Sequence, residues 1–135
     1  MHFALAFAVS GALAEGVGIL AGRRPLERWG GGMVLLGTAT LVLAVASGYL
    51  AANTAPHVTA AAEVALGGHE RMTLVATSAL VLLVLWKALG RGRIAEWQRP
   101  LYAVALLAAA LLLLWAALLG GRLVYDHGVG IMGPD

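Results

Sequence analysis

The stretch Gly67-Gly68-His69-Glu70-Arg71-Met72 places a histidine, a carboxylate and an arginine at the start of a long apolar segment. The uncharged run that follows, Met72 to Trp86, is only about 15 residues long, which as a helix covers about 22 Å of a hydrocarbon core about 30 Å thick. To cross a membrane, the segment must draw its charged residues toward the lipid, or let Arg71 and Lys87 extend to the two interfaces. The stretch therefore predicts a membrane-spanning helix with polar groups near one end.

The composition of the whole chain supports a membrane protein. The 135 residues are 61% hydrophobic and only 12% charged, whereas soluble domains carry about 25% charged residues. A chain with this balance belongs in a bilayer. Because it has no cysteine, disulfides, thiolate ligands and covalent haem attachment are excluded. Its few basic residues gather in two short links, so no nucleic-acid partner is expected.

Apolar segments separated by short polar links organise residues 1–135 as one transmembrane domain. We expect helices over about residues 3–22, 32–52, 69–89 and 100–125, with a short interfacial helix over Val58–Leu66 after Pro56. Backbone groups in lipid must be satisfied internally, which helices achieve. The expected fold is therefore all-α, a polytopic four-transmembrane-helix up-down bundle.

Basic residues predict the orientation of this bundle. Seven of the nine lysines and arginines fall in the two links on one face: Arg23, Arg24, Arg28, Lys87, Arg91, Arg93 and Arg99. The positive-inside rule makes that face cytoplasmic. We expect a multi-pass protein of the bacterial inner (cytoplasmic) membrane with both termini periplasmic or extracellular.

All histidines of the chain fall on the opposite, outer face: His2, His57, His69 and His127. Helix bundles build cofactor sites from side chains at similar depth on facing helices, and neutral imidazole binds haem iron, zinc and copper. Converging imidazoles would hold a b-type haem or a transition metal. Alternatively, histidines collect at membrane interfaces simply because they are amphipathic. A weak likeness of the two halves of the chain makes His2 with His69, and His57 with His127, candidate ligand pairs; His69 and His127 are the strongest single candidates.

Other side chains near these histidines are candidates for supporting roles. Met72 follows His69 by three residues and offers a thioether, although ordinary packing is the more usual role of a methionine. Glu70 and Asp126 are adjacent to His69 and His127. Neighbouring residues of a helix diverge by about 100°, so these carboxylates are expected to orient an imidazole rather than bind the same ion.

Glu15 is the charged residue that interrupts the first apolar segment. Small residues share its face, including Gly18 and Gly22 in a GxxxG spacing, which predicts a helix-packing surface. A carboxylate facing protein inside a membrane is typically functional, as a proton-relay group or a quinone contact. The alternative is a protonated acid hydrogen-bonded to hydroxyls of the other segments: Thr38, Thr40, Thr77 or Ser78.

Several strings resemble the family called domain of unknown function 2231, small four-helix bacterial membrane proteins. The most specific is the ending Gly120-Gly121-Arg122-Leu123-Val124-Tyr125-Asp126-His127-Gly128-Val129-Gly130. Ser47-Gly48-Tyr49-Leu50-Ala51-Ala52, the opening Met1-His2-Phe3-Ala4 and a histidine at the third segment add to it. The family's preceding His-Pro element is absent. Members are fused to cytochrome-type domains, so the resemblance implies a redox association.

The sequence thus predicts a cytochrome b-like electron-transfer protein or subunit that binds haem b near the outer face. An electron carrier of this kind is not itself an enzyme, and it needs a redox partner or a larger membrane complex. Two alternatives remain open: a cofactor-free accessory subunit of a respiratory or photosynthetic complex, and a protein that handles copper or another transition metal. Either could form homo-oligomers.

Overall fold

A computed structural model describes residues 2–54 and 59–129, and these residues fold into long helices joined by short links. The helices are α1 (His2–Leu20), α2 (Arg24–Thr54), α3 (Ala60–Leu89) and α4 (Arg99–Tyr125), with a 3₁₀ turn, η1 (Glu96–Gln98), before α4. All four are long and apolar enough to cross a membrane. The predicted all-α membrane bundle is therefore confirmed.

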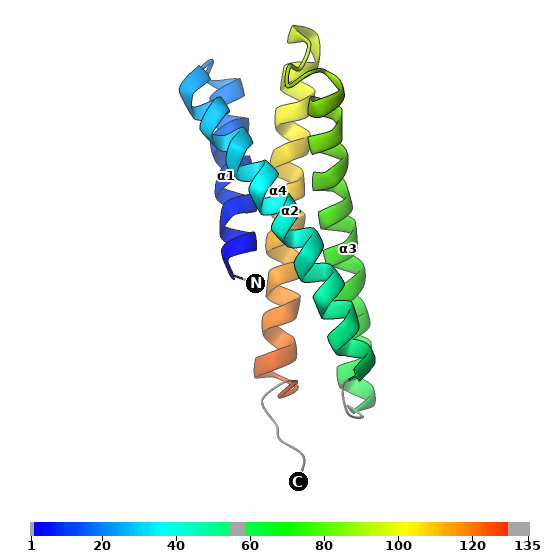
Figure 1. The fold of residues 1–135 in the computed structure, drawn as a ribbon. Helices are drawn as coiled ribbons and strands as arrows, with labels where there is room; N and C mark the ends of the chain where they lie inside the picture. Colours follow the sequence, from blue (N-terminus) through cyan, green and yellow to red (C-terminus); the bar gives the residue numbers. More distant parts are fainter. Residues whose placement is uncertain (1, 55–58, 130–135) are drawn as a thin grey trace.

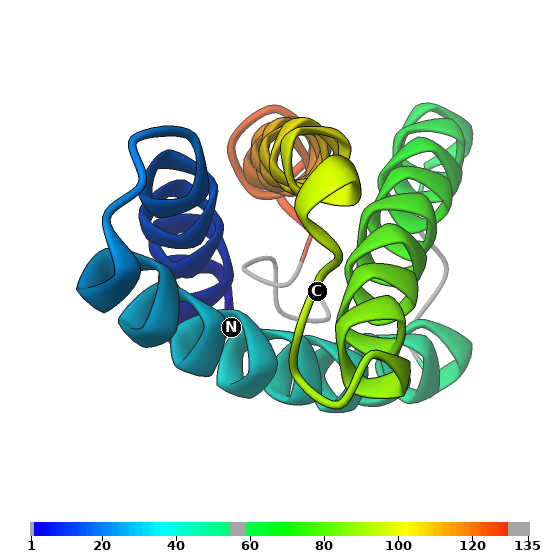
Figure 2. The same cartoon turned by 90° about the horizontal axis from the view of Figure 1, so that it is seen from above.

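The helices run alternately up and down, and α4 lies between α1 and α3 (Figures 1 and 2). Helix α2 crosses the bundle at an angle, packing on α1 along its first part and approaching the start of α3 at its far end. Helix α1 is the shortest, and its N-terminal end lies part way along α4 (Figure 1). We call the end that carries the α1–α2 and α3–α4 links the basic end, and the other the opposite end.

Helices α1 and α2 approach closely because small residues line their contact. A Cβ atom on Gly30 of α2 would clash with the backbone nitrogen of Glu15 on α1, and one on Gly18 would lie 2.5 Å from the backbone nitrogen of Glu27. In lipid the hydrophobic effect does not drive helices together, so close van der Waals packing must do so. The packing surface predicted on α1 is thus present.

Gly22 does not belong to that surface. It is exposed and follows the end of α1 with a φ of 66°. Its N–H donates to Ile19 O at 3.2 Å, and the Arg23 N–H donates to Gly18 O at 2.7 Å. This left-handed glycine closes the helix, a role in which the missing Cβ avoids strain.

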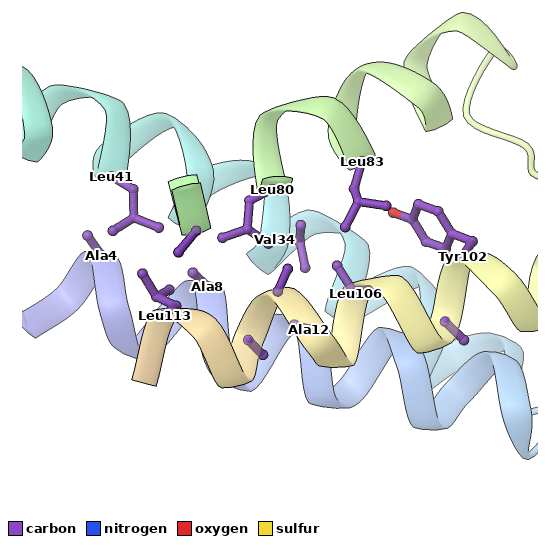
Figure 3. Close-up of a cluster of buried hydrophobic side chains, with 14 of the residues drawn as sticks. Ala4, Ala8, Ala12, Val34, Leu41, Leu80, Leu83, Tyr102, Leu106 and Leu113 are labelled. Carbon is purple, nitrogen blue, oxygen red and sulfur yellow. The ribbon is translucent and has the colours of Figure 1, made fainter. Parts of the chain in front are cut away.

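The buried core runs along α4 and draws side chains from every helix (Figure 3). At one end of the view Ala4, Leu41 and Leu113 lie together, and at the other the ring of Tyr102 points toward Leu83. Tyr102 is fully buried and meets Trp86 edge-on, with ring centroids 5.8 Å apart.

Two helices begin earlier than the hydrophobic segments indicated. Helix α2 starts at Arg24, with Pro25 in its first turn, rather than near residue 32. Helix α3 starts at Ala60 after Thr59, whose Oγ1 accepts the Ala62 N–H at 3.3 Å. The separate interfacial helix over 58–66 is therefore wrong, because its described part is the first turns of α3. Pro56 lies outside the described residues.

Candidate functional site

His69 does not open a helix but lies well inside α3, where its imidazole packs against α4. Its Nδ1 lies 2.9 Å from the backbone oxygen of Ala116. A carbonyl oxygen only accepts hydrogen bonds, so Nδ1 carries the proton and Nε2 of the neutral ring keeps its lone pair. Metal-ligating histidines are characteristically held in this way, through the nitrogen that does not bind the metal.

The His69 ring also packs closely on Gly120, which lies one turn beyond Ala116 on α4. A Cβ atom at Gly120 would lie 2.8 Å from His69 Cε1 and 3.2 Å from Nδ1. The ring occupies the space that any other residue at position 120 would fill. Ala116 is also buried, so the imidazole packs against two small residues of α4.

The face of α3 that continues from His69 is turned inward. Thr73, Ala76 and Leu80, which follow His69 at helical spacing, are all buried. The Thr73 hydroxyl, one turn from His69, has no hydrogen-bond partner within the described part of the chain. An unsatisfied buried hydroxyl is costly, so this group is available to the polar edge of a bound molecule.

The other predicted ligands are placed only in part. His127 is half-buried in the turn that follows α4, two residues after the last helical residue, Tyr125. That turn is closed by hydrogen bonds from Gly128 N to Val124 O at 3.1 Å and from Val129 N to Leu123 O at 3.0 Å. His2 is the first residue of α1, with its side chain outside the described set, and His57 lies outside the described residues.

The residues expected to support His69 contribute less to the orientation of its ring than the α4 backbone does. Glu70 and Met72 are half-buried in α3, and Asp126 is exposed after α4. The group that orients His69 is a carbonyl of α4 rather than the expected carboxylate. Across residues 2–54 and 59–129, no cluster of three or more His, Cys, Asp or Glu could hold a metal ion.

A second polar cluster lies toward the basic end, where Glu15 of α1 forms an ion pair with Lys87 of α3. The Glu15 side chain is 1% exposed and that of Lys87 is 24% exposed. Gly31 of α2 makes the space, because a Cβ there would lie 2.5 Å from Lys87 Nζ. The prediction that Glu15 faces protein is correct.

The hydroxyl partners considered for Glu15 are wrong. Thr40 donates to the backbone oxygens of its own helix, and the Thr38 and Thr77 hydroxyls have no partner among the described residues. Ser78 is exposed, away from the buried carboxylate. Sequence reasoning missed Lys87 because it was counted with the basic links. Lys87 follows Leu80 and Leu83 at helical spacing along the buried face of α3, and this face can be recognised only once the helices are packed.

One layer further toward the basic end, Arg99 of α4 binds Glu27 of α2 through two hydrogen bonds of 3.2 and 2.8 Å. The Arg99 Nε also lies 3.6 Å from a carboxylate oxygen of Glu96, which is 90% exposed. Charged groups thus extend from the surface of the basic end to the buried Glu15 layer.

Comparison with known proteins agrees with this architecture. No curated protein and no solved structure matches the chain. Residues 1–133 match the family described as "Predicted membrane protein (DUF2231)". Because the match covers nearly the whole chain, this protein belongs to the DUF2231 family of predicted membrane proteins.

Proposed function

We propose that this protein binds haem b in the opposite half of the bundle and carries electrons, with His69 as an axial ligand. The observation that carries the proposal is the hydrogen bond from His69 Nδ1 to Ala116 O. In the neutral ring this hydrogen bond selects the tautomer in which Nε2 keeps its lone pair. The ring packs against Gly120, in the space that a Cβ atom would fill. Histidines that merely sit at an interface need no such orientation.

The donor set favours haem over a metal ion bound by protein alone. Zinc and copper sites take three or four protein ligands, whereas haem brings four nitrogens and needs only one or two axial side chains. Among the described residues, His69 is not part of any cluster of three or more His, Cys, Asp or Glu that could hold a metal ion. His127, His2 and His57 are the candidates for a second axial position.

The chain's own residues would shape the site around such a group. His69 packs against Ala116 and Gly120 of α4, and Thr73 would offer its unpaired hydroxyl to a polar group of the haem. The apolar helices keep bulk water away, which tunes the reduction potential of a buried haem. Haem b itself would supply reversible one-electron transfer.

The basic residues indicate how the proposed electron carrier lies in the membrane. The basic end carries Arg23, Arg24, Arg28, Arg91 and Arg93, so it faces the cytoplasm and the haem lies near the outer face of the bacterial inner membrane. Both termini are then periplasmic or extracellular. Electrons must come from and pass to a redox partner, in a larger membrane complex or in a homo-oligomer.

The test is a reduced-minus-oxidised absorption spectrum of the full chain purified from a haem-replete host, with iron and copper analysis of the same sample. We expect the bands of a b-type haem, their loss or displacement in His69→Ala, and their retention in Arg71→Ala, which alters an exposed neighbour. Copper at one equivalent without iron would favour metal handling. A spectrum without haem bands and a sample without metal would overturn the proposal and favour an accessory subunit.

A further inference from the structure

The basic end holds a buried carboxylate that electron transfer at His69 does not use. The Lys87 ammonium occupies Oε1 of Glu15, but Oε2 has no hydrogen-bond partner in the part of the chain that the structure describes. A buried polar oxygen left without a partner loses its hydration and gains nothing in return. Binding a proton on the carboxyl group would relieve this cost.

Every helix contributes to the surroundings of Glu15. Lys87 of α3 forms the ion pair with Glu15, while the charge of Glu27 on α2 and the hydroxyl of Tyr102 on α4 lie near enough to influence the carboxylate. The Tyr102 hydroxyl is itself buried without a hydrogen-bond partner within residues 2–54 and 59–129. Glu15, Lys87 and Tyr102 thus lie in one layer of the bundle, and the Glu27–Arg99 pair lies in the next layer toward the basic end.

The space in this layer suits a very small occupant. The backbones of Gly30 and Gly31 press against Glu15 and Lys87. Two surface grooves of the protein do not include Glu15, Lys87 or Tyr102. One is lined by Arg24, Pro25, Arg28 and Trp29 at the start of α2, and the other by side chains of α4 and the turn after it, among them Trp115, Leu118 and Tyr125. A proton requires no cavity, whereas a quinone would.

Lys87 connects the buried oxygen with the surface. Its side chain is 24% exposed and it stands in the last turn of α3, at the basic end. Lysine ammonium groups readily extend to an interface. Beyond it the Glu27–Arg99 pair and the exposed Glu96 continue to the surface.

We propose that Glu15 and Lys87 form a proton-binding site that is loaded from the basic end through Lys87. In the loading step an N–H bond of the Lys87 ammonium breaks and an O–H bond forms on Glu15. The neutral amine then takes a proton from a hydronium ion at the basic end, which becomes water. The pair gains one proton, its net charge rises from zero to plus one, and no electron moves.

This site is separate from His69. Lys87 and His69 are about 27 Å apart along α3. Within residues 60–89, the buried hydroxyls end at Thr77, and the buried positions between it and Lys87 are the apolar Leu80 and Leu83. The proton site therefore stands whether or not the protein binds haem.

The test is infrared difference spectroscopy of the full chain in lipid nanodiscs, between high and low pH, in H₂O and in D₂O. We expect a carboxylic-acid band that grows as the pH falls, shifts in D₂O and is lost in Glu15→Gln. Glu96→Gln, which alters an exposed carboxylate, should keep the band. In Lys87→Met the band should persist to higher pH, because the cation that stabilises the carboxylate is gone.

Each other outcome overturns the proposal. A wild-type spectrum without such a band, or a band unchanged in Glu15→Gln, removes Glu15 as the proton site. A band lost in Glu15→Gln but unaffected by Lys87→Met removes Lys87 from it. If Glu15→Gln does not fold, ¹³C-carboxyl labelling of glutamate in the natural sequence identifies the same band, because the label excludes Asp126 and Asp135. A buried glutamic acid should exchange with D₂O more slowly than the other labelled carboxyl groups. The absence of such a slowly exchanging labelled band then rejects the site.

Discussion

Arg99, the first residue of α4, holds Glu27 of α2 with two guanidinium N–H groups, at 3.2 and 2.8 Å. The pair joins two helices that lie on different sides of the bundle (Figure 2). Both side chains are about one-fifth exposed, so solvent screens the attraction in part. Geometry rather than charge alone makes the contact specific, because the planar guanidinium matches a carboxylate.

Arg99→Lys should therefore destabilise the bundle although the charge is kept. We expect a loss of about 1 kcal/mol in the free energy of unfolding, measured by titrating the protein from mild detergent into denaturing detergent. Arg93→Lys, at an exposed link position, is the matched control and should change nothing. Equal stability of Arg99→Lys and the natural protein would show that the fork geometry contributes nothing.

Three consecutive glycines in α2 provide an internal comparison. Gly30 packs on the backbone of Glu15, whereas a Cβ on Gly32 would meet nothing within 4 Å. Gly30→Ala should cost at least about 2 kcal/mol, because backbone on both sides cannot yield. Gly32→Ala should be neutral or stabilise by up to about 1 kcal/mol, since alanine suits a helix interior better. Circular dichroism during detergent unfolding measures both, and equal effects at the two positions would contradict the close α1–α2 packing.

The number and type of helices could be predicted from the sequence, because hydropathy and the need to satisfy the backbone in lipid leave few choices. The helix starts could not be predicted as well. Hydropathy marks where a helix meets the hydrocarbon, and not where its hydrogen bonds begin, so the first turns of α2 were assigned to a link and those of α3 to a separate interfacial helix. Thr59 was the local signal for α3, as an N-cap followed by Glu63.

The candidate site was predictable as residue types but not as contacts. His69 stands out in any reading as an imidazole within an apolar segment. Its partner is a carbonyl of Ala116, and a backbone acceptor leaves no trace in side-chain chemistry. Glu15 stands out in the same way, while Lys87 did not, because a lysine near a basic link looks like a topology signal until the helices are packed.

The Glu15–Lys87 pair predicts an asymmetry between its two members. Glu15 is 1% exposed and Lys87 is 24% exposed, so only the lysine can reach water when its partner is removed. Lys87→Met leaves a carboxylate buried and should cost about 3–5 kcal/mol. Glu15→Gln should cost less, because the amide is neutral and Lys87 can extend to the interface.

Detergent unfolding of the two variants at neutral pH measures this difference. The control is the double variant Glu15→Gln/Lys87→Met, which removes both charges and should recover part of the loss seen in Lys87→Met. A larger loss of unfolding free energy in Glu15→Gln than in Lys87→Met would show that the lysine, and not the carboxylate, is the group that cannot reach water.

Gly120 gives the sharpest test of the histidine geometry. A Cβ on Gly120 would lie 2.8 Å from His69 Cε1, whereas one on the adjacent Gly121 would meet nothing within 4 Å. Gly120→Ala should push the ring away and break its hydrogen bond to Ala116, while the helix itself tolerates alanine well. We therefore expect Gly120→Ala to lose or displace the haem bands, and Gly121→Ala to keep them. If both variants are folded by circular dichroism and both keep unchanged bands, the clamped imidazole is not an axial ligand.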